Sequence, residues 1–346
     1  MDSTQPETMS YRALHDEGMS RIREVGAEEF LNLGAETRSQ NRLNREYIES
    51  LTFEMRFLGS GFASTRTELL GHEVAYPIQC AAVCDGRLLN ALSTYWEAPY
   101  LEEIAEGIAE AGSWMWIGEL EGHRLQRLVN IGVPIVRIVK PYYNAKWDES
   151  TEVIRQLKEA EERGCIAVGM DIDVFFGEKT GDEPPYRYAL GPQALELMEQ
   201  YVAATDLPFI VKGVLSEHDA MKSREVGASG VVVSHHGGEA IDFAVPILRV
   251  LPAIRQAWPD ATIFAETGFQ RGTDVLKALA LGADGVCMLN TLIVAYAAAG
   301  GRGVRDMLLT LAEELSRNMS ICGATSIDEV DESILWKPYP DRGRGE

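Results

Sequence analysis

The stretch LPFIVKGVLSEHDAMKSREVGASGVVVSHHGGEAID, residues 207–242, contains two short apolar runs separated by a segment of helix length. The runs PFIVK (208–212) and GVVVS (230–234) are rich in β-branched and aromatic residues, which favours buried strands. The segment 216–226 between them has helical periodicity, and Ser216 is a suitable N-cap. A strand, a helix and a strand in this order predict two parallel strands joined by a crossover helix.

The same alternation continues on both sides of this stretch. Further strands are predicted at 76–84, 113–118, 134–140, 165–172, 262–266 and 285–289. Further helices are predicted at 99–111, 119–130, 149–163, 190–204, 243–256, 271–281 and 303–319, with Thr273 as a second N-cap. Eight strand and helix units within about 250 residues predict an α/β fold, the (β/α)8 TIM barrel. A doubly wound open sheet is the alternative, but no G-x-G-x-x-G motif follows the first strand.

The N-terminal part of the chain differs from the rest. Residues from about 10 to 50 are charged and helix-favouring, with few strand signals, so we expect a helical N-terminal arm at 1–50. The barrel then occupies 51–346, including a C-terminal helix and tail. The polar, Gly- and Pro-containing segment DVFFGEKTGDEPPYRY (173–188) is expected to form a loop near the mouth of the barrel.

Composition excludes several classes of partner. The 53 acidic and 32 basic side chains give a net charge of −21, which repels nucleic acid. No apolar run approaches the roughly 18 residues of a membrane helix, and no apolar segment follows a basic start. We expect a soluble, cytoplasmic protein with a small-molecule substrate. The five cysteines, an odd and sparse set, are expected to be reduced core thiols: Cys80, Cys84, Cys165, Cys287 and Cys322.

The residues that close the predicted strands are polar where a core would be apolar. Active sites of TIM barrels lie at the carboxyl ends of the strands. The closing residues are Cys84, Gly118, Lys140, Asp171, Lys212, Ser234 with His235 and His236, Glu266 with Thr267 and Gly268, and Asn290. A lone strand-end lysine often extends to solvent, but Lys212 shares this ring with a histidine pair and an aspartate. Glycine turns before the helices at 243–256 and 271–281 offer backbone N–H groups to a phosphate.

Two blocks make the chain similar to a known family, the FMN-dependent 2-hydroxy acid oxidases and dehydrogenases, which include glycolate oxidase, lactate oxidase and mandelate dehydrogenase. The stretch 207–242 resembles the family's strand-five lysine and its strand-six Ser-Asn-His-Gly-Gly-Arg segment. RGTDVLKALALGADGV (271–286) resembles its phosphate-binding helix almost letter for letter. The resemblance runs from about Phe30 to Ile334 and implies FMN as the cofactor, with tetramers by analogy and no metal.

The resemblance also implies residue roles. Lys212 would lie beside the N1/O2 edge of the flavin and stabilise the anionic reduced ring. His236 would take the substrate hydroxyl proton as general base while a hydride passes to flavin N5, and Tyr142 would assist in the substrate pocket. His235 stands where the family has Asn and would play a supporting part. The implied cofactor contacts are Ala82, Val83, Gly118, Lys140, Asp171, Lys212, Ser234, His236, Gly237, Gly238, Glu266, Thr267, Gly268, Gln270, Arg271, Leu289 and Asn290.

The chain departs from the family at the substrate carboxylate. The clamping Arg is replaced by Glu239, and an assisting Tyr by Phe30, so a carboxylate substrate would face like charge. We therefore expect an amine, an amino-alcohol or a neutral substrate. The alternative is that Glu239 faces solvent or pairs with a base such as Arg271, and that another arginine, such as Arg187, holds a carboxylate.

The flavin side departs as well. Lys140 replaces a Gln, Asp171 a Thr, Gln270 an Arg, and LNT (289–291) the usual Gly-Arg-Pro, so two cationic phosphate ligands are absent. Arg271 and backbone amides are left to hold the phosphate. Two other functions stay open: an FMN-dependent isomerase or reductase of the type 2 isopentenyl diphosphate isomerase kind, and a non-catalytic flavin-binding barrel.

Overall fold

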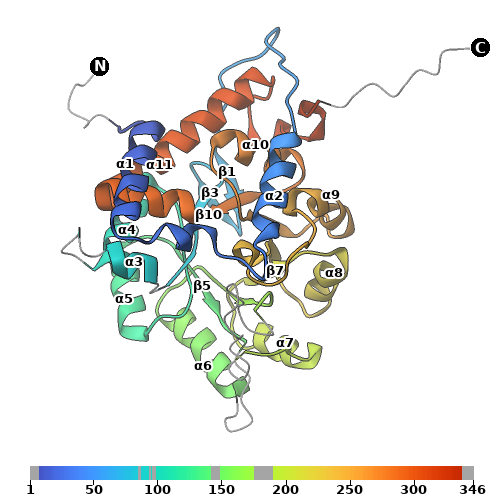
Figure 1. Ribbon diagram of the computed structural model, residues 1–346. Helices are drawn as coiled ribbons and strands as arrows, with labels where there is room; N and C mark the ends of the chain where they lie inside the picture. The colour runs from blue at the N-terminus through green and yellow to red at the C-terminus, as the bar shows by residue number, and fades with distance from the viewer. Residues whose placement is uncertain are drawn as a thin grey trace, which may run out of the picture.

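The computed structural model describes residues 8–84, 87–92, 95, 99–141, 149–174 and 190–336, and it contains a closed barrel of eight parallel strands (Figure 1). The strands are β3 (Ile78–Val83), β4 (Met115–Ile117), β5 (Ile135–Val139), β6 (Ala167–Asp171), β7 (Phe209–Val214), β8 (Gly230–Val233), β9 (Thr262–Glu266) and β10 (Gly285–Met288). They pair in chain order, and β10 closes the ring against β3. The predicted TIM barrel and all eight predicted strands are confirmed.

Helices surround the barrel (Figure 1). They are α3 (Arg87–Leu92), α4 (Tyr100–Ala111), α5 (Gly122–Ile131), α6 (Glu149–Glu162), α7 (Leu195–Val202), α8 (Glu217–Glu225), α9 (Ile247–Ala257), α10 (Gly272–Ala280) and α11 (Asn290–Ile321). Ser216 caps α8 as predicted, because its hydroxyl accepts the Asp219 N–H at 3.0 Å. The Thr273 cap is wrong: α10 begins at Gly272 with Arg271 in the N-cap position. Helix α11 begins well before the predicted 303 and is interrupted by non-helical backbone at Ala299 and Gly300.

The N-terminal arm is helical, as predicted. It consists of α1 (Tyr11–Glu24), the 3-10 helix η1 (Glu28–Asn32) and α2 (Ser39–Ser50). Helix α1 packs along α11, and α2 contacts α9 and the turn after β8. The division of the chain at residue 50 stays a prediction.

A short antiparallel hairpin precedes the barrel and was not predicted. It pairs β1 (Thr67–Leu69) with β2 (His72–Val74). Leu69 and Val74 are buried in one cluster with barrel residues such as Trp116 and Phe264. Strands of three residues carry too little periodicity to stand out in a sequence, so this element was missed.

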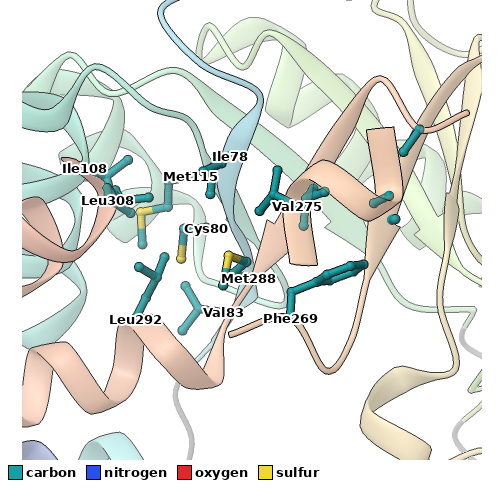
Figure 2. Close-up of a cluster of buried hydrophobic side chains, with 14 of the residues drawn as sticks. Ile78, Cys80, Val83, Ile108, Met115, Phe269, Val275, Met288, Leu292 and Leu308 are labelled. Atoms are coloured by element: carbon teal, nitrogen blue, oxygen red, sulfur yellow. The ribbon is translucent and has the colours of Figure 1, made fainter. Parts of the chain in front are cut away.

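The barrel has an inner and an outer apolar layer. Alternate residues of β3 show the division, because Ile78 and Cys80 pack towards the helices (Figure 2) whereas Ala81 belongs to the inner cluster. Four cysteines are buried as expected, and burial raises the pKa of Cys80 to about 12. The prediction is wrong for Cys84, which is exposed just beyond the end of β3. None of the described helices combines the length and hydropathy that a bilayer-spanning helix requires.

Helices α4 and α11 approach each other backbone to backbone. A Cβ atom at Gly107 would lie 2.1 Å from the carbonyl oxygen of Gly301, and one at Gly301 would lie 2.3 Å from that of Glu103. These glycines therefore allow α4 and α11 to pack closely.

Gly107→Ala is expected to lower the free energy of unfolding by about 1–3 kcal/mol, because the added methyl group forces the two helices apart. In an uncrowded helix the same change would stabilise by up to about 1 kcal/mol, so the sign is diagnostic. Urea unfolding measures the effect. Glu106→Ala, at an exposed site on α4, is the control and should change stability by no more than about 0.5 kcal/mol. A stabilised Gly107→Ala variant would contradict the packing argument.

Candidate functional site

Charged side chains gather inside the barrel at the carboxyl ends of its strands. Asp171 ends β6 and stands in register with Lys212 of β7. Their exposed fractions are only 2% and 3%. Ile210 belongs to the inner cluster, and side chains alternate along a strand, so Lys212 also points inward. The sequence places these residues here because each lies at the end of an apolar strand segment.

The charges form a continuous chain of ion pairs. The two oxygens of Asp171 lie 3.0 Å from Lys140 Nζ and 2.9 Å from Lys212 Nζ. Lys212 Nζ also lies 3.1 Å from Glu266 Oε2, at the end of β9. Four strand ends are thereby linked through side chains of alternating charge.

Both central groups are ionised despite their burial. Burial acts to raise the pKa of Asp171, but Lys140 and Lys212 outweigh it and the net pKa is lowered. Burial acts to lower the pKa of Lys212, but Asp171 and Glu266 outweigh it and the net pKa is raised well above its ordinary value. The barrel therefore holds a fixed ammonium group at its carboxyl face.

His236 lies beside this chain, in the 3-10 turn η2 (His236–Gly238). Its backbone has φ +50°, and Gly237 and Gly238 follow at +64° and +90°, so the glycines permit the sharp turn after β8. The His236 N–H donates to Ser234 Oγ at 3.0 Å. Lys212 Nζ is 3.5 Å from His236 Nδ1, so the lysine and the histidine identified from the sequence lie in one site.

Asp173 is a functional candidate that the sequence analysis missed. Its Oδ1 lies 3.0 Å from His236 Nδ1. Burial and Lys212 act to lower the pKa of His236, but Asp173 outweighs them and the net pKa is raised. The signal was present in the position, because Asp173 follows shortly after the end of β6, at the carboxyl face where the other site residues lie. The segment from residue 173 was interpreted only as a loop.

The neighbouring histidine has a different environment. His235 is 2% exposed, and burial lowers its pKa to about 4, so it is neutral at physiological pH. It takes no part in the ion-pair chain, and its supporting role stays a prediction. Ser234 is fully buried at the end of β8 and orients the backbone of His236.

The remaining predicted site residues are spread around the carboxyl face. Gly118 N–H donates to Val83 O at 3.0 Å, next to Ala82 on β3, and the Gly118 carbonyl accepts from the buried Arg137. Glu239 is half-buried and ends the turn of His236, whose carbonyl accepts its N–H at 3.1 Å. Phe30 lies in η1 and packs on the main core. Tyr142 and Arg187 lie outside the described residues.

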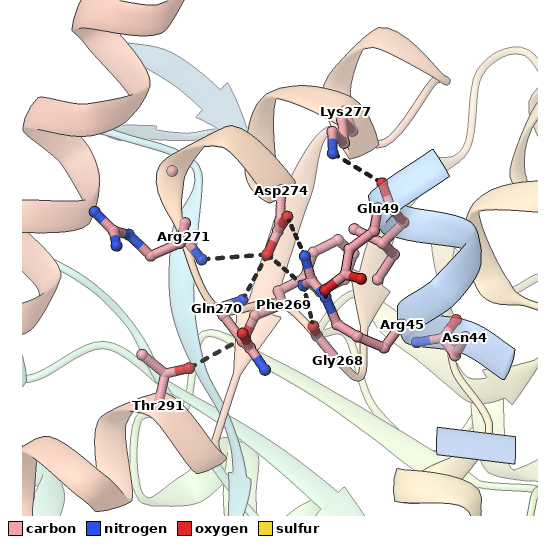
Figure 3. A network of polar contacts seen from close by, with 12 residues as sticks. Asn44, Arg45, Glu49, Gly268, Phe269, Gln270, Arg271, Asp274, Lys277 and Thr291 are labelled. Atoms are coloured by element: carbon pink, nitrogen blue, oxygen red, sulfur yellow. Dashed lines mark hydrogen bonds and ion pairs between the residues drawn. The ribbon is translucent and has the colours of Figure 1, made fainter. Parts of the chain in front are cut away.

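The turn between β9 and α10 is held by the N-terminal arm (Figure 3). Thr267 has φ +93°, a strained value for a β-branched residue. Asn44 donates to its carbonyl at 3.0 Å, and Arg45 donates to the carbonyl of Gly268 at 3.0 Å. Arg45 also forms an ion pair at 2.7 Å with Asp274 of α10. Contacts from α2 thus fix the conformation of this turn.

Arg271 is directed away from the turn. Its guanidinium pairs with Glu314 of α11 and lies 4.0 Å from the centroid of the Tyr11 ring. Figure 3 shows its side chain pointing to the opposite side from Gly268. At the start of α11, the side chain of Asn290 donates to Leu31 O at 2.8 Å. The structure therefore separates Arg271 from the lysine and histidine end of the site.

One cluster in the described part of the chain has the composition of a metal site. Asp171, Asp173 and His236 each offer a ligand atom within 4.8 Å of the others. Both oxygens of Asp171 are already ion-paired with lysines, so the cluster is better explained as part of the charge network. The expectation of no metal stays a prediction.

Comparison with known proteins gives consistent matches. The model of the FMN-dependent dehydrogenase family matches residues 20–197 and 191–337. A 4-hydroxymandelate oxidase from Amycolatopsis orientalis is 29% identical over 338 residues, covering 86% of this chain and 90% of the relative. Glycolate oxidase 3 from Oryza sativa subsp. indica is 28% identical, covering 86% and 88%. An L-lactate dehydrogenase from Pseudomonas syringae pv. syringae (strain B728a) is 43% identical over only 131 residues, 38% of this chain and 34% of that protein.

Solved structures agree with the sequence matches. Mandelate oxidase with benzoyl-formic acid has a TM-score of 0.81 and 28% identity, covering 95% of this chain and 98% of that one. A mandelate oxidase mutant with a monooxide FMN adduct has a TM-score of 0.79 and 29% identity, covering 92% and 98%.

Asp173→Asn is expected to lower the pKa of His236 from above its ordinary value to below it, because burial and Lys212 would then act without the opposing carboxylate of Asp173. NMR titration of the imidazole C–H signals measures this, and His236→Asn identifies the signal. Asp219→Asn, beside the exposed His218, is the matched control and should leave the pKa of His236 unchanged. If both aspartate variants leave it unchanged, Asp173 does not control the histidine.

Proposed function

The chain belongs to the FMN-dependent dehydrogenase family, and we propose that this FMN-dependent oxidoreductase oxidises an amine, an amino-alcohol or another substrate with a positive or neutral group in place of a carboxylate. The observation that carries the proposal is Glu239, which ends the turn of His236 where the family has its clamping arginine. The curated relatives bear the names of enzymes that act on hydroxymandelate, glycolate and lactate.

The residues at the carboxyl face fit the ring of FMN, which supplies the two-electron acceptor when it is bound. The buried ammonium of Lys212 is suited to a ring that gains negative charge. Asp173 Oδ2 is buried without a hydrogen-bond partner among the described residues, which fits a site that takes a further polar group. We propose that Lys140, Asp171 and Lys212 hold the ring edge. The turn from Thr267, together with Leu289 and Asn290, would lie at the phosphate end.

His236 is proposed as the general base. Because Nδ1 of His236 lies 3.0 Å from Asp173 Oδ1, the neutral ring keeps its proton on Nδ1. This N–H donates a hydrogen bond to the carboxylate of Asp173. Nε2 is then left with a lone pair that can accept the proton from the substrate. The pKa of His236 is raised. The neutral imidazole, which is the basic form, is therefore gained as the pH rises through that pKa, and activity should increase over the same range.

Glu239 sets the charge of the substrate end in this proposal. Asp173 pairs with His236, and Lys212, which lies beside the histidine, links it to the carboxylates of Asp171 and Glu266. A carboxylate substrate would add negative charge there without an arginine partner, whereas a cationic or neutral substrate would not.

The other interpretations receive less support. A diphosphate-using isomerase needs cations at the phosphate end, where Arg271 is paired with Glu314. A non-catalytic barrel does not require a histidine and aspartate pair beside a buried lysine. A hydroxy acid substrate would need another arginine, such as Arg187, which lies outside the described residues.

Lys212→Ala is expected to slow flavin reduction by about 100-fold or more while weakening FMN binding less, because the charge that the lysine stabilises grows during the reaction. Anaerobic stopped-flow reduction and FMN titration measure the two effects. Removing the lysine also leaves buried carboxylates uncompensated, at a cost of about 3–5 kcal/mol, so thermal unfolding is recorded in parallel. Lys222→Ala, at a surface ion pair, is the control. Equal reduction rates in variant and wild type would refute the role.

The wild-type protein is expected to reduce its flavin with an amine or amino-alcohol and not with glycolate, lactate or mandelate. Glu239→Arg, alone and with Phe30→Tyr, should increase hydroxy acid turnover by at least about 100-fold, since each 1.4 kcal/mol is a factor of ten. Anaerobic bleaching with a panel of both substrate classes is the assay, and Glu239→Gln separates charge from size. Efficient reduction of the wild-type flavin by a simple 2-hydroxy acid would show that the charge argument is wrong.

A further inference from the structure

The N-terminus of α10 is already occupied by carboxylates of the chain itself. Asp274 Oδ2 accepts the N–H groups of Gln270 at 3.0 Å and Arg271 at 3.3 Å. Glu314 Oε2 accepts the N–H of Gly272 at 3.0 Å. Three consecutive donors that would otherwise be available to an anion are satisfied internally, and a phosphate approaching them would meet two negative side chains.

The arginines around this turn are also paired with carboxylates of the chain. Arg271 pairs with Glu314 and stacks on Tyr11. Arg45 pairs with Asp274 at 2.7 Å and with Glu49 at 2.8 Å. Hydrogen bonding to Glu314 raises the pKa of Arg271, as expected for a cation held by its partner. Each guanidinium already shares its charge with a carboxylate, which weakens its attraction for a phosphate.

Lys277, the lysine of α10, is also hydrogen-bonded within the chain. Lys277 is 8% exposed, and its Nζ donates to Ile48 O of the arm at 2.8 Å. At the second loop of this end, Asn290 and Leu289 stand in place of the family's Arg and Gly, and the Asn290 side chain is bound to the arm. Among the described residues at the phosphate end, Arg45, Arg271 and Lys277 are therefore each already bound to another group of the chain.

We infer, resting on the proposed flavin site, that this chain holds its flavin by the ring and the ribityl chain and has no arginine contact to the phosphate. Riboflavin, which has the same ring and ribityl chain without the phosphate, then binds nearly as tightly as FMN. The two arginine positions of the family are taken here by the uncharged Gln270 and Asn290, and the nearby Arg271 and Arg45 are each paired with a carboxylate of the chain.

The test is a titration of the flavin-free protein with riboflavin and with FMN, prepared from the purified holoenzyme and followed by flavin fluorescence. The expected dissociation constants differ by less than about tenfold, and both change little with salt because no phosphate ion pair is broken. A larger preference for FMN overturns this inference and leaves the proposed function intact. Binding of neither flavin overturns both.

Two variants test the inference without relying on the ratio of the wild-type dissociation constants for riboflavin and FMN. Glu314→Gln releases Arg271, and Gln270→Arg adds a guanidinium; each is expected to raise the affinity for FMN about tenfold and to leave that for riboflavin unchanged. Glu313→Gln, exposed on the same helix, is the control and should change neither affinity. If Glu314→Gln fails to fold, Gln270→Arg carries the comparison alone. Equal gains for both flavins, or no gain for FMN, would count against the inference.

Discussion

Asp171 and Lys212 place opposite full charges 2.9 Å apart in the buried interior of the barrel, and removing either would leave the other with less compensation. Lys140 and Glu266 complete the balance on either side. This requirement for pairing accounts for the closeness of Lys140 and Asp171, because the lysine balances the buried carboxylate. It also fixes the position of the ammonium group beside His236.

The N-terminal arm belongs to the site as much as the barrel does. Ala35 N–H donates to Gly238 O at 2.8 Å, next to the turn of His236, while Asn44 and Arg45 hold the turn after β9. The arm therefore ties together two loops from different strands. Loops at the carboxyl face of a TIM barrel carry function, and here their conformation depends on a segment that is remote in sequence.

The two ends of the proposed flavin site differ in how their charged groups are paired. At the ring end the chemistry-bearing groups are together, with a fixed ammonium and a histidine oriented by Asp173. At the phosphate end the cations are paired with Glu314 and Asp274. Glu239 adds a carboxylate at the proposed substrate end.

The sequence by itself determined the barrel and its ring of polar strand ends, because strand and helix periodicities are local and the carboxyl ends of parallel strands meet at one face. Lys212 and His236 could be identified in this way. The hairpin at Thr67–Val74 was too short for that signal, and Thr273 was a plausible cap that the backbone did not use. The pairings of Asp173 with His236 and of Arg271 with Glu314 join residues 63 and 43 positions apart. Only the tertiary structure decided them, because an ion pair depends on which side chains the packed helices and strands bring within reach.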